Sequence, residues 1–316
     1  MYSEMKNTIH TTDQDAQYDE CAKRLLGQKI ILAHILVHAV DEFRGMKEED
    51  VVSYIEGDPY ISAVPVDPGM TNQAFEKEGE RVVGFNSENQ ELYEGLIRFD
   101  IIFYVRLKDE VSQMIINIEA QRKEPAEYHI LNRAVFYTCR MISSQKERDF
   151  INSNYNDIKR VYSIWVCMNM KENSMEHIHL EKDSFINSHN WKGNMELFNI
   201  IMIGLSEEVP EAEKKYELHR LLGALLSKTL TAQEKENIME EEYKIPMERQ
   251  LREEVDIMCN LSQDIREEAT ETATKATLLK VIFRMDSQGY TKAQIAGVAD
   301  MDEKQVEEIL SNAKAQ

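Results

Sequence analysis

Three segments rich in β-branched and aromatic residues constrain the fold of this chain more than any other feature. They are residues 97–106, 111–121 and 161–168. Side chains of these types favour extended backbone, so each segment predicts a β-strand. The first two are joined by the short polar link 108–110, which predicts an antiparallel hairpin.

A helical pattern at 128–144 lies between the second and third predicted strands. The apolar positions that recur there at helical spacing are Ile130, Ala134, Tyr137 and Met141. A helix that crosses from one strand to the next in the same sheet makes the two strands parallel. The sequence therefore predicts an α/β fold in which a central mixed β-sheet is flanked by helices.

The character of the chain changes twice. Residues 1–20 form a polar leader, and residues 207–316 are helical, charged and almost free of strand signal. We therefore expect a leader at 1–20, a core domain at 21–206 and an all-helical C-terminal region at 207–316. The C-terminal helices are also a candidate element for homo-oligomerisation.

Two segments of the core domain precede the strands. Residues 29–46 are apolar on most faces and predict a helix that ends near Gly45. Residues 53–72 contain several glycines and prolines, so we expect irregular loop structure there.

The last part of the chain, residues 278–310, has a break at Gly289 and two candidate helix N-caps, Thr291 and Asp302. Both caps come shortly before apolar positions. The pattern fits a helix-turn-helix-like unit, but it favours a small helical hairpin packed on its neighbours.

The charge balance bears on the partners of the chain. The formal net charge is −20, whereas contact with nucleic-acid phosphates needs local Lys and Arg. The acid is unevenly placed: residues 96–165 hold 11 basic and 9 acidic residues, and residues 207–316 hold 15 and 24. The middle of the chain can thus present a basic surface around a few carboxylates.

The cellular setting expected from the sequence is cytoplasmic. The four cysteines form no CxxC pair, so reduced thiols fit better than a zinc ribbon or a disulfide framework. The N-terminus has no apolar signal segment, and no apolar run is long enough to cross a bilayer. We therefore expect no membrane association.

Two carboxylates stand in otherwise apolar predicted strands. Asp100 lies in the first strand and Glu119 at the end of the second, two residues before Gln121. Residues two apart on a strand share a face, and hairpin pairing can bring Asp100 beside them. Two such carboxylates with a cation between them would make a Mg²⁺ site, since Mg²⁺ takes oxygen ligands. The spacing is short and degenerate, and it also fits two unrelated acids at a sheet edge.

These residues resemble a known superfamily. Phe99-Asp100-Ile101, the hairpin, the run NIEAQ at 117–121 and the following helix are similar to the PD-(D/E)XK nucleases. The closest likeness is to the PD-(D/E)XK nuclease family transposases, related to the recombination-promoting nucleases, across roughly residues 24–180. The resemblance implies a restriction-endonuclease-like fold and metal-dependent hydrolysis of DNA phosphodiester bonds with Mg²⁺ or Mn²⁺.

The resemblance also implies roles for individual residues. Asp100 and Glu119 match the two motif acids, and the backbone carbonyl of Ala120 is the expected third metal ligand. Gln121 stands where most of the superfamily has Lys, and Phe99 replaces the motif proline. Members of the superfamily often carry a further acid on the first helix.

The remaining candidates surround that motif. For the further acid the candidates are Glu42 and Glu94, each of which also fits a solvated acid. Arg122, Lys123 and Arg133 are candidates for holding a DNA phosphate, and each also fits an ordinary surface charge.

Two readings of function follow. The first is a Mg²⁺-dependent DNA endonuclease in mobile-element or recombination biology. The alternative is a catalytically decayed nuclease-fold module with a binding or regulatory role, which the replacement of Lys by Gln121 would mark.

Histidines give a weaker signal. His34 and His38 are four apart on one predicted helix, but Ile35 stands where the HExxH metal motif needs glutamate. We expect both to be packed or half-exposed core histidines. His177 and His179 are expected in a surface hairpin.

Overall fold

The computed structural model describes residues 17–61, 74–77, 80–83, 88–91, 95–98, 101–106, 113–121, 128–146 and 148–314. The chain divides by its internal contacts into two compact units. The larger unit is Ala16–Cys259, and the smaller one contains Asn260–Gln316. The boundary at 259 differs from the one expected at 206 because helices that follow residue 206 contact the sheet: α5 (Glu217–Leu225) packs against its strand β10.

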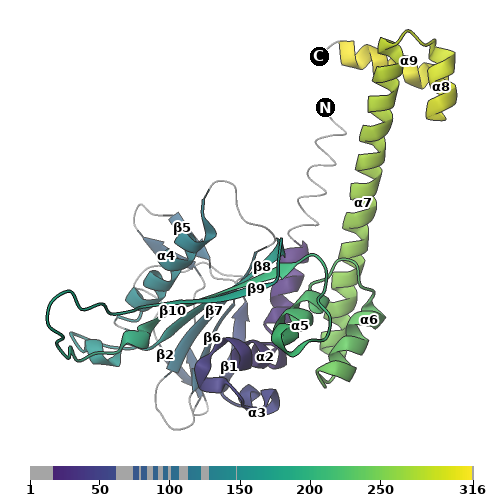
Figure 1. Ribbon diagram of the computed structural model, residues 1–316. Coiled ribbons are helices and arrows are strands. Elements are labelled where there is room, and N and C mark those ends of the chain that lie inside the picture. The colour runs from purple at the N-terminus through teal and green to yellow at the C-terminus, as the bar shows by residue number, and fades with distance from the viewer. Residues whose placement is uncertain are drawn as a thin grey trace. The chain divides into compact units, whose positions relative to one another are not determined.

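The larger unit is built on a mixed β-sheet (Figure 1). Within the described residues this sheet has six strands in the order β1-β6-β7-β8-β10-β9. Their bounds are β1 Ile55–Ile61, β6 Ile101–Arg106, β7 Gln113–Gln121, β8 Val161–Met170, β9 Ser174–His179 and β10 Phe198–Ser206. β6 runs antiparallel to β1 and β7, and β8 runs parallel to β7 and β10. The predicted hairpin and the predicted parallel crossover are confirmed.

Burial explains the positions of the strands. All residues of β8 from Val161 to Met168 are buried, as expected for a strand covered on both faces. By contrast, β9 is exposed at nearly every position and forms one edge of the sheet. Strands β9 and β10 extend the sheet beyond the three strands that the sequence predicts.

Helices cover both faces of the sheet (Figure 1). Helix α4 (Ile130–Ser143) packs on β8 and β10 and confirms the helix predicted at 128–144. Its Ala134 and Tyr137 share a buried cluster with Trp165 of β8 and Ile200 of β10. The other face carries α2 (Lys29–Ala39) and α5, which contact each other. The expected α/β class, a mixed sheet flanked by helices, is thereby confirmed.

The smaller elements of this unit complete the chain order. A helix over residues 17–26 precedes α2. The others are η1 Asp41–Phe43, α3 Glu48–Val52, β2 Ala74–Lys77, β3 Glu80–Val83, β4 Glu88–Glu91, β5 Gly95–Arg98, η2 Tyr155–Asp157, η3 Met195–Leu197, η4 Lys214–Tyr216, α6 Ala232–Asn237 and the π-helix η5 Ile238–Glu242. β2 pairs with β3 and β4 with β5, each as a separate two-stranded sheet.

Three local expectations were wrong. The helix predicted at 29–46 ends at Ala39, because the β-branched Val40 adopts extended backbone before η1 begins. The irregular segment expected at 53–72 begins with β1: Gly57 has φ +57° at a register shift, which gives the strand a bulge. Of the strand predicted at 97–106 in one sheet, residues 97–98 belong to β5, which pairs with β4, and residues 101–106 form β6 of the main sheet.

The smaller unit contains the end of α7 (Arg249–Ser287), α8 (Lys292–Ala299) and α9 (Glu303–Lys314). Gly289 has φ +83° and follows α7. Thr291 and Gln294 form a capping box at the start of α8, and Asp302 and Gln305 exchange equivalent bonds at the start of α9. Both predicted N-caps are confirmed.

A small apolar core holds these helices together. It consists of the buried residues Ile282, Ile295, Ala296, Ala299, Val306 and Leu310. Asp300 ends α8 in the left-handed conformation, so a short turn leads into α9. The end of the chain is thus a pair of capped helices packed on the last turns of α7.

Among the helices in the described part of the chain, none combines the length and the apolar character that crossing a bilayer requires.

Candidate functional site

The motif residues of the second predicted strand lie at the end of β7, between β6 and β8. The ladder pairs Glu119 with Trp165 and Gln121 with Cys167 of β8. Both β8 residues belong to the buried cluster beneath α4. On the other side of β7, Ile118 pairs with Ile101, the first residue of β6. The backbone of the motif is therefore in the middle of the sheet, on rigid, paired strands.

Several predicted site residues lie outside the described residues. They are Asp100, Glu94, Arg122 and Lys123, together with the side chains of Glu119, Ala120 and Gln121. Their predicted roles stay predictions.

Arg133 is the predicted phosphate-binding residue that the structure describes most fully. It lies on the first turn of α4, with its guanidinium carbon 4.7 Å from the centre of the Tyr137 ring and 5.4 Å from that of Trp165. It donates hydrogen bonds to the hydroxyls of Tyr137 (2.9 Å) and Tyr128 (3.2 Å). Cation–π contact and two hydroxyl acceptors hold the guanidinium in one place.

The contacts of Arg133 connect it to the motif strand. Trp165, whose ring it faces, is the ladder partner of Glu119. The structure therefore brings together α4, the aromatic pair Tyr137 and Trp165, and the β8 position next to the motif acid. This is a half-buried cation on an aromatic platform, unlike a solvated surface charge.

Glu42 has different neighbours. Its carboxylate forms an ion pair with Arg160 and accepts a hydrogen bond of 3.0 Å from the Tyr162 hydroxyl. Burial, followed by the Glu42 charge, raises the pKa of Tyr162, so that its hydroxyl stays protonated and donates. A role for Glu42 as accessory acid has to compete with these two bonds.

Sequence reasoning did not single out Asp149. Its side chain is only 2% exposed and is paired with Arg148 at 2.6 Å and Lys159 at 3.3 Å. The Tyr104 hydroxyl also bonds to it at 3.4 Å. A buried carboxylate needs such partners, and these fasten the segment between α4 and β8 to β6. Its sequence context, a mixed run of charges, gives no signal of burial.

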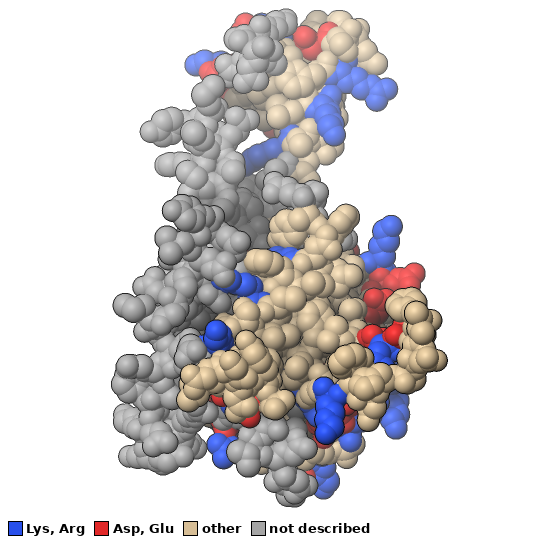
Figure 2. Space-filling model, turned by 90° about the vertical axis from the view of Figure 1, so that its left-hand side faces the viewer, with Lys and Arg blue, Asp and Glu red and all other residues tan. Residues whose placement is uncertain are grey.

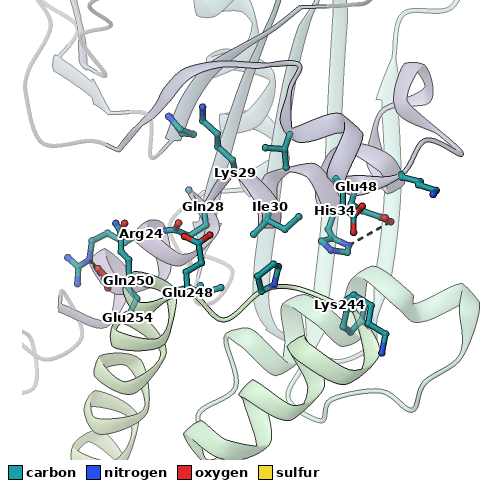
Figure 3. Close-up of a pocket in the computed structure, with 18 of the residues that line it drawn as sticks. Arg24, Gln28, Lys29, Ile30, His34, Glu48, Lys244, Glu248, Gln250 and Glu254 are labelled. Carbon is teal, nitrogen blue, oxygen red and sulfur yellow. Dashed lines mark hydrogen bonds and ion pairs between the residues drawn. The ribbon is translucent and has the colours of Figure 1, made fainter.

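A separate cleft of about 1190 Å³ opens between α2, α3 and the segment that leads into α7 (Figure 3). Most of its lining is charged, and many of these charges pair with each other. Arg24 bonds to Glu254 at 2.9 Å, and the Lys29 ammonium lies 4.0 Å from Asp58. Seven carboxylates and four basic side chains line the cleft, so it carries more negative than positive charge.

His34 lies against this cleft but is almost fully buried. Its Nδ1 is 3.8 Å from a Glu48 carboxylate oxygen (Figure 3). Its ring also meets the Tyr243 ring edge-on. Burial lowers the pKa of His34 to about 4, although the Glu48 charge acts in the opposite direction. The separation is that of an ion pair, but at neutral pH the imidazole is uncharged and the contact is a weak polar one.

The other histidines follow the expectation of packed or surface roles. His38 Nδ1 lies 2.8 Å from the backbone carbonyl of His34, and its Nε2 lies 3.6 Å from Glu217. His177 and His179 are on β9, with ring centres 4.8 Å apart. Over the ranges that the structure describes, no group of three or more His, Cys, Asp or Glu side chains is arranged to hold a metal ion.

Comparison of the chain with protein-family models, with curated proteins and with solved structures found no match.

Proposed function

We propose that this chain is a metal-dependent DNA nuclease of the PD-(D/E)XK superfamily, close to its transposase branch. Support comes from the order of elements: a helix, three antiparallel strands, a crossover helix and a parallel strand. This order is compatible with the restriction-endonuclease-like fold that the resemblance implies. The resemblance implies motif acids on adjacent central strands; in the sequence Asp100 directly precedes Ile101 of β6, and Glu119 belongs to β7.

One observation carries the proposal. The register of the hairpin pairs Ile101 with Ile118. In the sequence, Asp100 directly precedes Ile101 and Glu119 directly follows Ile118. Directly opposite residues of an antiparallel pair share a face of the sheet, so continuing this register by one residue would set the two acids side by side.

The donor set suits a hard divalent cation. Two carboxylates and the backbone carbonyl of Ala120 offer only oxygen ligands, as Mg²⁺ and Mn²⁺ prefer. A bound ion would polarise the scissile phosphate and lower the pKa of an attacking water. Asp100 and Glu119 would hold this ion, and its charge would offset the repulsion between their carboxylates.

The uncharged neighbour Gln121 cannot act as a general base. Its amide can donate to a phosphate oxygen and accept from a water, so it orients one or the other. Arg133 holds a phosphate of the DNA backbone, because a planar guanidinium kept in place by Tyr137 and Trp165 is prepared for bidentate contact. Arg122 and Lys123 add positive charge directly after the motif.

The test is nicking of supercoiled plasmid DNA by the full chain with Mn²⁺ or Mg²⁺, with EDTA as the metal-free reaction. We expect nicking that requires the metal and that is lost in Asp100→Ala and Glu119→Gln. The matched control is Glu176→Gln, which removes an exposed carboxylate from strand β9 of the same sheet. Metal-dependent nicking that persists in Asp100→Ala rules out this site.

The alternative is a decayed nuclease-fold module, which Gln121 in the usual place of Lys favours. It predicts no nicking by the unmodified chain under any metal condition. A Gln121→Lys variant distinguishes the two readings further: restored nicking would show a site that is intact except for this residue.

A further inference from the structure

The connection between β9 and β10 exposes an unusual set of apolar side chains. Phe185 is 95% exposed, Ile186 83% and Trp191 77%. A fully buried apolar side chain of this size gains about 1.5–3 kcal/mol relative to an exposed one. When three apolar side chains in one connection stay exposed at this cost, they indicate a surface that binds a partner.

A second group of exposed apolar residues emerges from the same end of the sheet. Ile151 is 62% exposed and Tyr155 60%, in the segment that leads into β8. β8 and β10 are parallel and start level, with Val161 beside Phe198, so the segments before both strands leave the sheet together. An ion pair of 2.6 Å between Arg160 and Glu196 joins the two segments.

We give the name arm patch to six exposed apolar residues of these segments, leaving out Leu180 at the end of β9: Ile151, Tyr155, Phe185, Ile186, Trp191 and Met195. Figure 2 looks from the side on which the β9–β10 connection and α4 lie in Figure 1. Over the middle of this face, charged side chains are sparse.

The area of the arm patch matches one half of a stable protein interface. A buried aromatic side chain contributes about 150–250 Å², so Tyr155, Phe185 and Trp191 offer roughly 450 Å² even at the low end. The three aliphatic members bring the total close to the approximately 800 Å² that each partner contributes to a standard interface.

The charges beside the arm patch decide between two kinds of partner. Residues 151–160 and 180–197 together hold four acids and four bases, so neither sign of charge predominates. Binding to single-stranded nucleic acid would need a positive groove beside the aromatic rings. Neighbouring charges of both signs instead suit a self-complementary surface, in which each sign meets its opposite across a two-fold axis.

We infer that the arm patch is the homodimer interface of this chain, and that each copy buries its arm patch against that of a second copy. A two-fold interface uses the same surface on both copies, so one apolar patch on each copy is sufficient. The aromatic residues are its energetic centre, since Trp and Tyr dominate such interfaces. This inference does not depend on the proposed nuclease activity.

The experiment is sedimentation equilibrium of the full chain over a concentration series in the micromolar range, where interfaces of this size associate. We expect the unmodified chain to be a dimer and the double variant Phe185→Ser with Trp191→Ser to be a monomer. The control is Val298→Ser, which removes another exposed apolar side chain (62%) from α8 in the C-terminal helices. The control should remain a dimer.

Thermal unfolding of the double variant at monomeric concentrations shows whether it is folded. Because Phe185 and Trp191 are so exposed, we expect a cooperative transition within a few degrees of the unmodified chain. A monomeric unmodified chain would overturn the inference, and so would a double variant that still dimerises. Loss of dimerisation in Val298→Ser alone would also overturn it and assign association to the C-terminal helices.

Discussion

The roles of single residues in this chain depend on neighbours that are distant in the sequence. In the sequence Arg133 is one polar residue of a helical pattern. In the fold its guanidinium lies over the ring of Trp165 on strand β8. The sequence could nominate Arg133, but its spacing could not distinguish a phosphate-binding cation from a solvated one. Asp149 was not nominated at all, because the partners that bury it come from β6 and from both sides in the chain.

Arg133→Lys tests the role of the stacked guanidinium. Lysine keeps the charge but has neither the plane that lies over two rings nor the bidentate geometry. We expect affinity for a short DNA duplex, measured by fluorescence anisotropy, to fall by about 1.5–3 kcal/mol. Arg249→Lys, at an exposed position on α7, is the control and should leave affinity unchanged. Equal affinity in Arg133→Lys would limit Arg133 to a structural role.

His34 makes the stability of the larger unit depend on pH. Its folded-state pKa of about 4 lies below the ordinary value, because the imidazole is buried. Between about pH 4 and about pH 6.5, the His34 imidazole is protonated in the unfolded chain and neutral in the folded chain. Stability is therefore complete above pH about 6.5 and falls as the pH drops toward 4.

The magnitude follows from the shift. Each pKa unit corresponds to about 1.4 kcal/mol, so the full loss is on the order of 3 kcal/mol. Urea unfolding at pH 7 and at pH 5 should show about 2 kcal/mol of this loss, and His34→Phe is expected to show a smaller difference between the two pH values. His129→Phe, at an exposed position before α4, should keep the full difference. An unchanged pH dependence in His34→Phe would contradict the account.

The secondary-structure elements divide into those that local sequence determines and those that tertiary context determines. β7, β8 and α4 were predictable because their apolar residues follow a clear period or form an unbroken run. β1 was not, because Gly57 and Pro59 signal a loop, whereas an edge strand with a bulge tolerates both. β9 was missed as a strand of the main sheet because its exposed, polar residues are paired only through β10.

The helix caps of the smaller unit were predictable, and they can be tested directly. Thr291→Ala removes the hydroxyl that accepts a hydrogen bond from the Gln294 backbone N–H. This N–H at the start of α8 then has only solvent as a partner. We expect the unit to lose about 1 kcal/mol of stability, measured by amide hydrogen exchange of α8 and α9. Thr277→Ala, in the middle of α7, is the control and should be neutral or slightly stabilising, because alanine is the better helix former. Equal effects of the two variants would exclude a capping role.

At the scale of the whole molecule, the chain combines a strongly acidic composition with a nearly neutral central region. The net charge of −20 gives the chain no general affinity for DNA, so any such contact depends on the local basic residues near the motif. The fold class followed from three strands and one helix. For the candidate site, the sequence could predict only which strands pair and which residues share a face, because these follow from alternation and register. It could not predict which side chains bind a ligand, because that depends on their positions in space.

The central claim is that Asp100 and Glu119 together bind one divalent ion. Calorimetric titration of the full chain with Mn²⁺ tests it most directly, with Asp100→Asn, Glu119→Gln and the control Glu176→Gln titrated alongside. The account predicts one ion bound per chain in the unmodified protein and in the control, and none in either motif variant. Unchanged Mn²⁺ binding in both motif variants, or no binding by the unmodified chain, would contradict it.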